Sequence, residues 1–263
     1  VPTMVKALLA HDVRFPPTLR QILVVGGSLS PDTLREMTDR FKGLKIGISY
    51  GLTEASPRVT YMSLPEEMEK IGSVGKPVSC CTVGILDENG APLPAGEIGE
   101  ICVQGSNVMK EYLNARELTA NAKPDGNTLL TGDIGYLDQD GYLYVMGRKD
   151  NRLKVDGHNL YPEEVENVLS SHPLVRAAVV RTEKTDEYER LVAYIEGGPL
   201  DPFELKKFCS QKLSIYKIPK HFYFFDELPK TISGKVKRNA INQPANRSDG
   251  REHHFEGYRK AQS

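Results

Sequence analysis

The chain has 263 residues, 26% of them charged, and a formal net charge of −1. That length can bury one or two hydrophobic cores, and the near-neutral charge provides no strongly basic surface for nucleic acid. No apolar run approaches the roughly 20 residues of a membrane span, and the start of the chain lacks the layout of a secretory signal. The four cysteines show no C-x-x-C spacing, which indicates reduced thiols in a cytoplasmic protein.

The first part of the chain has an α/β pattern. The run at 21–25 predicts a buried strand that ends at Gly26 and Gly27. A serine followed by proline predicts a capped helix over 31–41. A second strand is expected at 44–49. Because both strands end in glycine turns, this edge is expected to face a ligand, as in open α/β sheets.

The middle of the chain has a different pattern. Turn sequences at 87–90 and 138–141 separate short alternating runs such as 100–104 and 142–146. Acidic and glycine-containing turns between alternating runs are typical of β-hairpins. We therefore expect a region rich in hairpins and similar to a β-barrel.

A small α+β module is expected after Asp150. Its expected elements are a helix at 162–170, strands at 176–181 and 191–196, a helix at 202–213 and a strand at 221–225. The tail from 244 is polar and charged, which predicts disorder.

The predicted fold class is therefore α+β with several subdomains. The large domain is expected at 1–149, with its α/β part at 1–71 and its barrel-like part at 72–147. A mobile C-terminal domain is expected at 150–243.

Five short motifs follow one another along the chain. They are Tyr50-Gly-Leu-Thr-Glu54, Gly99-Glu-Ile-Cys-Val-Gln-Gly105, Thr131-Gly-Asp133, Gly147-Arg-Lys-Asp150 leading to Gly157, and Ser233-Gly-Lys235.

The first motif places three useful side chains at a strand end. Tyr50 can stack on a purine, Thr53 can hydrogen-bond a phosphate oxygen, and Glu54 can hold Mg²⁺. A tyrosine-glycine turn with a capping threonine explains the same residues equally well.

The other motifs also have two interpretations. Asp133 can accept ribose hydroxyls or cap a turn. Lys235 can neutralise phosphate charge or serve as an ordinary surface lysine. From the residues alone, Gly26 and Gly27 are best explained as a plain turn.

The ordered set of motifs resembles the adenylate-forming superfamily, which includes acyl-CoA synthetases, nonribosomal peptide adenylation domains and luciferases. The resemblance covers roughly residues 1–241. Leu52 resembles acyl-CoA synthetases, because peptide-synthetase adenylation domains usually have proline there.

The resemblance implies ATP or AMP, Mg²⁺ and coenzyme A as ligands, with a carboxylic acid as substrate. The resemblance also implies which residues line the nucleotide site, namely Gly26, Gly27, Tyr50 and Gly51. Thr53 and Glu54 are expected to act on the phosphates, with Glu54 as the metal ligand.

The resemblance also implies roles near the small module. Asp133 is expected to bind the ribose and Arg148 the ribose or phosphate. Asp150 is expected to be a hinge, and Gly157 is expected to let a pantetheine arm pass. Lys235 is expected to bridge the attacking carboxylate and the α-phosphate of ATP.

The superfamily's Ser/Thr/Gly-rich phosphate loop does not occur in the sequence. The chain therefore resembles the C-terminal half of a ligase, with the N-terminal half of the same enzyme as its partner. The 263-residue chain by itself is expected to be inactive. An enzyme that loads a carrier protein, a non-catalytic nucleotide-binding fragment and a homodimer stay open.

Overall fold

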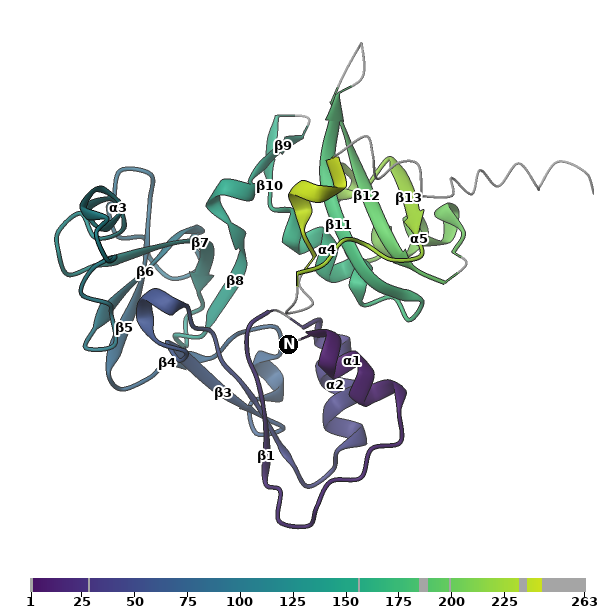
Figure 1. Cartoon of the computed structure of the whole chain (residues 1–263), viewed down its shortest axis with the longest axis horizontal. Helices are drawn as coiled ribbons and strands as arrows, with labels where there is room; N and C mark the ends of the chain where they lie inside the picture. The colour runs from purple at the N-terminus through teal and green to yellow at the C-terminus, as the bar shows by residue number, and fades with distance from the viewer. Residues whose placement is uncertain are drawn as a thin grey trace, which may run out of the picture. The chain divides into compact units, whose positions relative to one another are not determined.

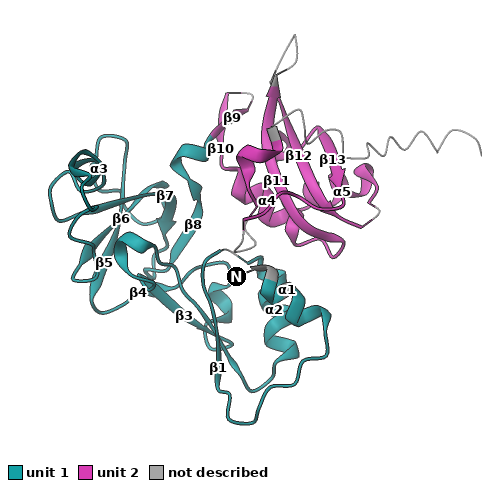
Figure 2. Ribbon diagram, in the orientation of Figure 1, with its two compact units in different colours: residues 1–152 teal, residues 153–263 magenta. Residues whose placement is uncertain are grey.

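The computed structural model describes residues 2–27, 29–155, 157–184, 189–198, 200–231 and 236–242. The chain forms two compact units, unit 1 over Val1–Arg152 and unit 2 over Leu153–Ser263, which Figure 2 distinguishes by colour. The elements are labelled in chain order in Figure 1. The predicted disordered tail, 244–263, lies outside the described residues.

The first sheet of unit 1 is mixed. It contains, in spatial order, β1 (Gln21–Val24), β2 (Lys45–Ile48), β3 (Thr60–Leu64) and β4 (Lys76–Pro77). The first two strands are parallel, as an α/β segment requires, whereas β3 and β4 are added in antiparallel fashion. The α/β character is therefore confined to the pair of strands whose ends the sequence singled out.

Two helices accompany this sheet, α1 (Pro2–Ala10) and α2 (Pro31–Arg40). The Ser30 side chain accepts a hydrogen bond from the Thr33 amide at 3.2 Å, which confirms the predicted N-cap. Met37 of α2 is fully buried in a core shared with β2 and β3. Helix and sheet are thus held together mainly by apolar burial.

The second sheet of unit 1 is antiparallel throughout. It contains β5 (Cys81–Leu86), β6 (Gly99–Gly105), β7 (Leu129–Leu137) and β8 (Leu143–Arg148) in that order. The connection between β6 and β7 includes α3 (Arg116–Ala122). The chain is described without a gap from 29 to 155, and within that range β5 and β8 are open edges, so the barrel-like region is an open sheet.

The predicted hairpin turns are present between β5 and β6 and between β7 and β8. Asp87 accepts hydrogen bonds from two backbone amides of its own turn, and Asp138 does the same. Gly90 and Gly141 both have a φ of 80°, a conformation that favours glycine. The acidic and glycine residues that identified the turns therefore also stabilise them.

Unit 2 begins with a short hairpin and continues as a three-stranded sheet. The hairpin pairs β9 (Leu153–Val155) with β10 (His158–Leu160). The sheet pairs β11 (Val175–Lys184) antiparallel to β12 (Glu189–Gly197), which is parallel to β13 (His221–Phe225). The two helices are α4 (Pro162–Ser170) and α5 (Pro202–Ser210).

The main core of unit 2 joins both helices to the sheet. Leu169 of α4 and Leu205 of α5 are fully buried, together with Ile195 of β12. The predicted helix at 202–213 ends three residues earlier than expected, at Ser210. This arrangement confirms a small α+β unit.

Short 3₁₀ turns occur at Thr53–Ala55 (η1), Met68–Lys70 (η2), Lys149–Asn151 (η3), Ile215–Lys217 (η4) and Arg238–Asn242 (η5). Of the helices in the described ranges, none combines the length and the apolar character needed to traverse a lipid bilayer. All four cysteines are free thiols, and Cys80 alone of them is exposed.

Candidate active site

The ends of β1 and β2 lie at one edge of the first sheet. The parallel register pairs Val24 with Ile48, and the Ser49 amide donates to the Val24 carbonyl at 3.3 Å. Gly26 and Tyr50 follow the two strands by the same number of residues. The glycine has a φ of 79°, which a residue with a side chain rarely adopts. The ends of the two parallel strands therefore lie side by side, and the expectation that this edge faces a ligand stays a prediction.

A chain of polar contacts joins this edge to the second sheet. The Tyr50 hydroxyl donates to Asp133 Oδ2 at 2.6 Å, and Arg148 Nη1 lies 3.1 Å from Asp133 Oδ1. Burial, followed by the adjacent Asp133 carboxylate, raises the pKa of Tyr50 above its usual value. The phenol therefore stays protonated and holds the carboxylate as a donor.

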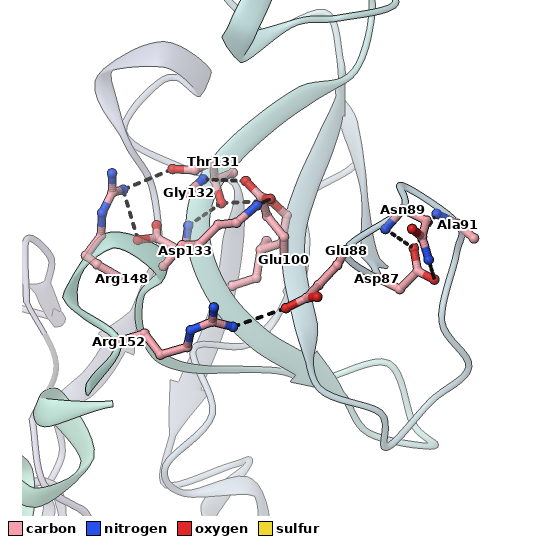
Figure 3. Close-up of polar contacts among 12 residues, drawn as sticks. Asp87, Glu88, Asn89, Ala91, Glu100, Thr131, Gly132, Asp133, Arg148 and Arg152 are labelled. Carbon is pink, nitrogen blue, oxygen red and sulfur yellow. Dashed lines mark hydrogen bonds and ion pairs between the residues drawn. The ribbon is translucent and has the colours of Figure 1, made fainter. Parts of the chain in front are cut away.

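Asp133 and Arg148 face each other because β7 and β8 pair at these two positions. Figure 3 shows the guanidinium between the Asp133 carboxylate and the Thr131 carbonyl, which accepts a hydrogen bond from Arg148 at 2.9 Å. The Arg148 side chain is 48% exposed, whereas that of Asp133 is 13% exposed. The carboxylate is thus fixed within the sheet while its partner reaches solvent.

The backbone of this motif is held by a second carboxylate. Glu100 accepts a hydrogen bond from the Gly132 amide at 3.2 Å (Figure 3). It also pairs with Lys149 at 2.6 Å. Gly132 has a φ of 70°, and a Cβ there would lie 3.0 Å from Arg148. Glycine is therefore required between the threonine and the aspartate.

The first motif continues into the short turn η1, which carries Thr53 and Glu54. Gly51 leads into this turn, and a Cβ on it would lie only 2.3 Å from the Pro57 carbonyl oxygen. Thr53 is exposed and Glu54 is half-buried. Glu54 Oε1 accepts a hydrogen bond from the Tyr112 hydroxyl at 2.7 Å.

The donor atoms of this turn fit one kind of magnesium site. A carboxylate and a hydroxyl are the hard oxygen ligands that Mg²⁺ prefers. Within the described residues, no three His, Cys, Asp or Glu side chains gather closely enough to hold a metal ion. Magnesium often binds through one or two carboxylates together with waters and substrate phosphates. The residues therefore fit an ion that arrives with a nucleotide, rather than one held in a protein cage.

Three further residues were predicted for the site. Asp150 is in the exposed 3₁₀ turn η3 at the end of unit 1. Gly157 is exposed in the β9–β10 turn of unit 2, with a φ of 82°. Lys235 lies outside the described residues.

Sequence reasoning missed two residues that contact the site. Tyr112 lies 58 positions from Glu54, and Glu100 lies 32 positions from Gly132. Glu100 belongs to the second quoted motif, but nothing in that motif pairs it with a distant amide. Neither contact follows a helix or strand period, so no local pattern predicts it.

Comparison with protein families identifies the class. The family model of AMP-binding enzymes matches residues 1–113, and the model of the AMP-binding enzyme C-terminal domain matches 164–235. The fold agrees with these matches, because solved structures of adenylate-forming enzymes superpose on the chain. The chain belongs to the adenylate-forming superfamily of AMP-binding enzymes.

The chain is similar to 2-succinylbenzoate–CoA ligases. Those of Bacillus subtilis (strain 168) and Bacillus licheniformis are each 40% identical to it over 243 residues, 92% of this chain. The chain spans about half the length of these curated relatives, 49% and 50% respectively.

Solved structures agree with this similarity. The O-succinylbenzoate CoA synthetase of Bacillus subtilis in complex with AMP superposes with a TM-score of 0.82 at 38% identity, over 92% of this chain and 50% of that chain. Other structures of that enzyme contain the acyl-adenylate intermediate, or ATP and a magnesium ion. An anthranilate CoA ligase in complex with anthranoyl-AMP gives a TM-score of 0.81 at 29% identity, over 94% of this chain and 48% of that chain.

Proposed function

We propose that this chain is part of an AMP-forming acid–CoA ligase. In the first step a carboxylate oxygen attacks the α-phosphorus of ATP, and pyrophosphate leaves. In the second step the thiolate of coenzyme A attacks the acyl carbon, and AMP leaves. The observation that carries the proposal is the hydrogen-bonded series Tyr50–Asp133–Arg148, which joins the end of β2 to strands β7 and β8, in a member of the AMP-binding family.

The side chains of unit 1 are proposed to hold the nucleotide. The backbone at Gly26 and Gly27 and the Tyr50 ring line the adenine site, and Asp133 accepts the ribose hydroxyls. Arg148 has a half-exposed guanidinium that can donate to the ribose or a phosphate. These contacts fix the nucleotide so that its α-phosphate is presented to the acid.

Thr53 and Glu54 are proposed to act at the phosphates. The exposed Thr53 hydroxyl can donate to a phosphate oxygen. Glu54 would hold Mg²⁺, which neutralises phosphate charge when it is bound. Tyr112 occupies one oxygen of the Glu54 carboxylate and leaves the second for this task.

Residues towards the C-terminus are proposed to separate the two steps. Lys235 neutralises the charge that develops between the attacking carboxylate and the α-phosphate. The C-terminal domain at 150–243 then turns about Asp150 and removes that lysine. Gly157, which has no side chain, leaves room for the pantetheine arm.

The proposed acid is 2-succinylbenzoate or a closely related aromatic carboxylic acid. The support is the 40% identity to two 2-succinylbenzoate–CoA ligases across 92% of this chain. The proposed location is the cytoplasm, where reduced thiols persist, because all four cysteines are free.

The test uses the complete ligase, with this chain joined to the rest of its large domain. Acid-dependent exchange between ATP and labelled pyrophosphate measures the first step, with 2-succinylbenzoate, anthranilate, benzoate and hexanoate as candidate acids. Formation of acyl-CoA, or of an acylated carrier protein, measures the second. The 263-residue chain alone serves as the control and should release no pyrophosphate.

We expect exchange that is strongest with 2-succinylbenzoate and a thioester that forms with coenzyme A. Transfer of the acyl group only to a carrier protein would show that the protein is a carrier-loading enzyme and not a CoA ligase. Nucleotide binding without exchange for any acid would favour a non-catalytic role. Robust pyrophosphate release by the isolated chain would show that the site is complete within these residues.

A further inference from the structure

The turn that carries Glu54 is held by one neighbouring segment, residues 107–112. The Asn107 side-chain amide donates to the Ala55 carbonyl at 2.8 Å, and the Met109 amide donates to the Glu54 carbonyl at 2.7 Å. The Tyr112 hydroxyl donates to the Glu54 carboxylate at 2.7 Å. Two of these bonds fix the backbone of the turn, and the third fixes the functional side chain.

The backbone beside this turn is strained. Ser56 has a φ of 70° and a ψ of 163°, a region that almost only glycine occupies. Such a conformation persists only where surrounding contacts determine it. The hydrogen bonds from segment 107–112 are contacts of this kind, because they bind the two residues that precede Ser56.

Segment 107–112 is itself anchored by α3. The Thr119 hydroxyl accepts a hydrogen bond from the Tyr112 amide at 2.9 Å, and the Lys123 ammonium donates to the Met109 carbonyl at 3.0 Å. Val108 and Met109 also pack against the buried cluster that contains Ala55. The Tyr112 ring is therefore placed by the fold and does not depend on a ligand.

The Tyr112–Glu54 contact is directional. A protonated phenol has one proton to donate, and that proton is directed at Oε1. Within the described residues, Oε2 of the same carboxylate receives no hydrogen bond. A tyrosine phenol is protonated at neutral pH, so the Tyr112 hydroxyl is a donor there.

We propose that Tyr112 is a positioning residue that orients the Glu54 carboxylate, so that its second oxygen is directed at the metal–phosphate complex of bound ATP. The inference rests on the proposed ligase function. Tyr112 acts through Glu54 and contacts no reacting atom. Loss of the Tyr112 hydroxyl leaves the Glu54 carboxylate in place but free to rotate. Metal binding must then order the carboxylate, which weakens the affinity for the metal.

The same substitution at a second tyrosine provides a matched control. The Tyr142 hydroxyl donates to Glu67 Oε1 at 2.6 Å in unit 1, a half-buried contact of the same kind on a carboxylate outside the candidate site. Tyr112→Phe and Tyr142→Phe each remove one hydroxyl and keep the ring. Any difference between the two variants reports what the Glu54 carboxylate does.

The experiment uses the complete ligase with Mn²⁺ in place of Mg²⁺. Electron paramagnetic resonance measures free Mn²⁺ during titration in the presence of ATP and without acid, so the readout does not require turnover. Pyrophosphate exchange against Mg²⁺ concentration and thioester formation from supplied acyl-adenylate are measured in parallel. Thermal unfolding checks that both variants fold.

For Tyr112→Phe we expect about a tenfold weaker binding of Mn²⁺ in the ternary complex, the effect of losing one hydrogen bond to a charged group. The half-saturating Mg²⁺ for exchange should rise by a similar factor, and the thioester step should be unchanged. Tyr142→Phe should match the wild type in all three measurements.

Mn²⁺ binding by Tyr112→Phe within twofold of wild type would overturn the inference. Equal losses in both half-reactions, or the same change in Tyr142→Phe, would also overturn it, because they indicate a general structural effect. Failure of the ligase proposal would give a different result, because the wild type would then show no acid-dependent exchange. A tenfold difference in Mn²⁺ binding between the two variants would still support the role of Tyr112.

Discussion

Two arginine–carboxylate pairs, one in each unit, have the same chemical groups and different surroundings. Arg148 contacts Asp133 through one nitrogen and is 48% exposed. Arg238 contacts Glu166 through both terminal nitrogens, and their side chains are 27% and 12% exposed. The first arginine keeps donors available to a ligand, whereas the second is largely committed to its partner.

The second pair has a structural task. Glu166 of α4 also accepts a hydrogen bond from the Val180 amide of β11 at 2.7 Å. It therefore joins a helix, a strand and the segment η5, which contains Arg238. A buried carboxylate that anchors three elements indicates a structural role, whereas a half-exposed arginine at a strand end indicates a ligand-binding role.

The buried carboxylate Glu196 supports the same interpretation of unit 2. It is 4% exposed and accepts hydrogen bonds from Arg176, Lys230 and the Leu228 amide. Glu166 and Glu196 thus fix the described chain on both sides of residues 232–235. The contrast predicts that polar substitutions in unit 2 act mainly on stability and those in unit 1 mainly on catalysis.

The largest expected effect is on the stability of unit 2. Arg238→Met at pH 8 leaves the Glu166 carboxylate buried without its cation, which costs about 3–5 kcal/mol for a pair of this type. Urea unfolding of the chain measures the loss. The matched control is Arg152→Met, because Arg152 pairs with a Glu88 side chain that is 85% exposed and should lose less than about 1 kcal/mol. Equal losses would remove the distinction between the pairs.

Lys235→Ala is the expected exception, because a residue of unit 2 then affects catalysis. In the complete ligase the adenylation half-reaction should fall by about 10²-fold or more, the usual cost of removing one group that stabilises developing charge. The thioester step from supplied acyl-adenylate should be retained. Pyrophosphate exchange within threefold of the wild type would show that Lys235 does not have this role. Lys237→Ala, two residues further on, is the control.

Asp150→Pro tests whether the units exchange orientation between the two steps. Proline fixes φ near −65°, a value that fits the 3₁₀ turn Lys149–Asn151. It therefore prevents any backbone rotation at this position that needs a different φ. One half-reaction should survive and the other should fall by about tenfold or more, and we expect adenylation to survive. Asp150→Ala, which leaves φ free, separates the backbone effect from loss of the carboxylate. Equal loss of both half-reactions in Asp150→Pro would argue against a selective hinge.

The smallest effect concerns pH. Burial raises the pKa of Glu166 from 4.5 to about 7, although Arg238 and the Val180 amide favour the charged form. Between these two pH values the folded state binds more protons than the unfolded state, so stability falls as pH rises through this window. Between pH 6 and 7 the fall should be at most about 1 kcal/mol.

Thermal unfolding of wild type and Glu166→Gln at pH 6 and 7 measures this difference. The glutamine keeps an acceptor for the Val180 amide and removes the titration, so its dependence on pH should be flatter than that of the wild type. Parallel curves for the two proteins would assign the pH dependence to other groups. A flatter pH dependence in Glu166→Gln would support a structural role for Glu166.

Local signals in the sequence predicted several elements. Helix α4 occupies Pro162–Ser170, the predicted range, because proline and acidic residues define its first turn. Strand β13 likewise matches its predicted range, His221–Phe225. Helix α2 starts at its predicted cap. Each of these signals lies within a few residues of the element that it defines.

Elements without such signals were missed. Helix α3 follows Ala115, whose side chain makes no capping hydrogen bond, and it buries no residue completely. Its sequence therefore shows neither an N-cap nor an apolar stripe. Its contribution appears only in three dimensions, where Thr119 and Lys123 hold segment 107–112.

The sequence by itself determined the order of the motifs, the superfamily and the positions of the hairpin turns and of most strands. Only the tertiary structure decided which side chains meet: Tyr50 with Asp133 across 83 positions, and Tyr112 with Glu54 across 58. The reason is physical. A helix or strand period relates residues a few positions apart, whereas these contacts depend on strand register and on how the two sheets of unit 1 pack.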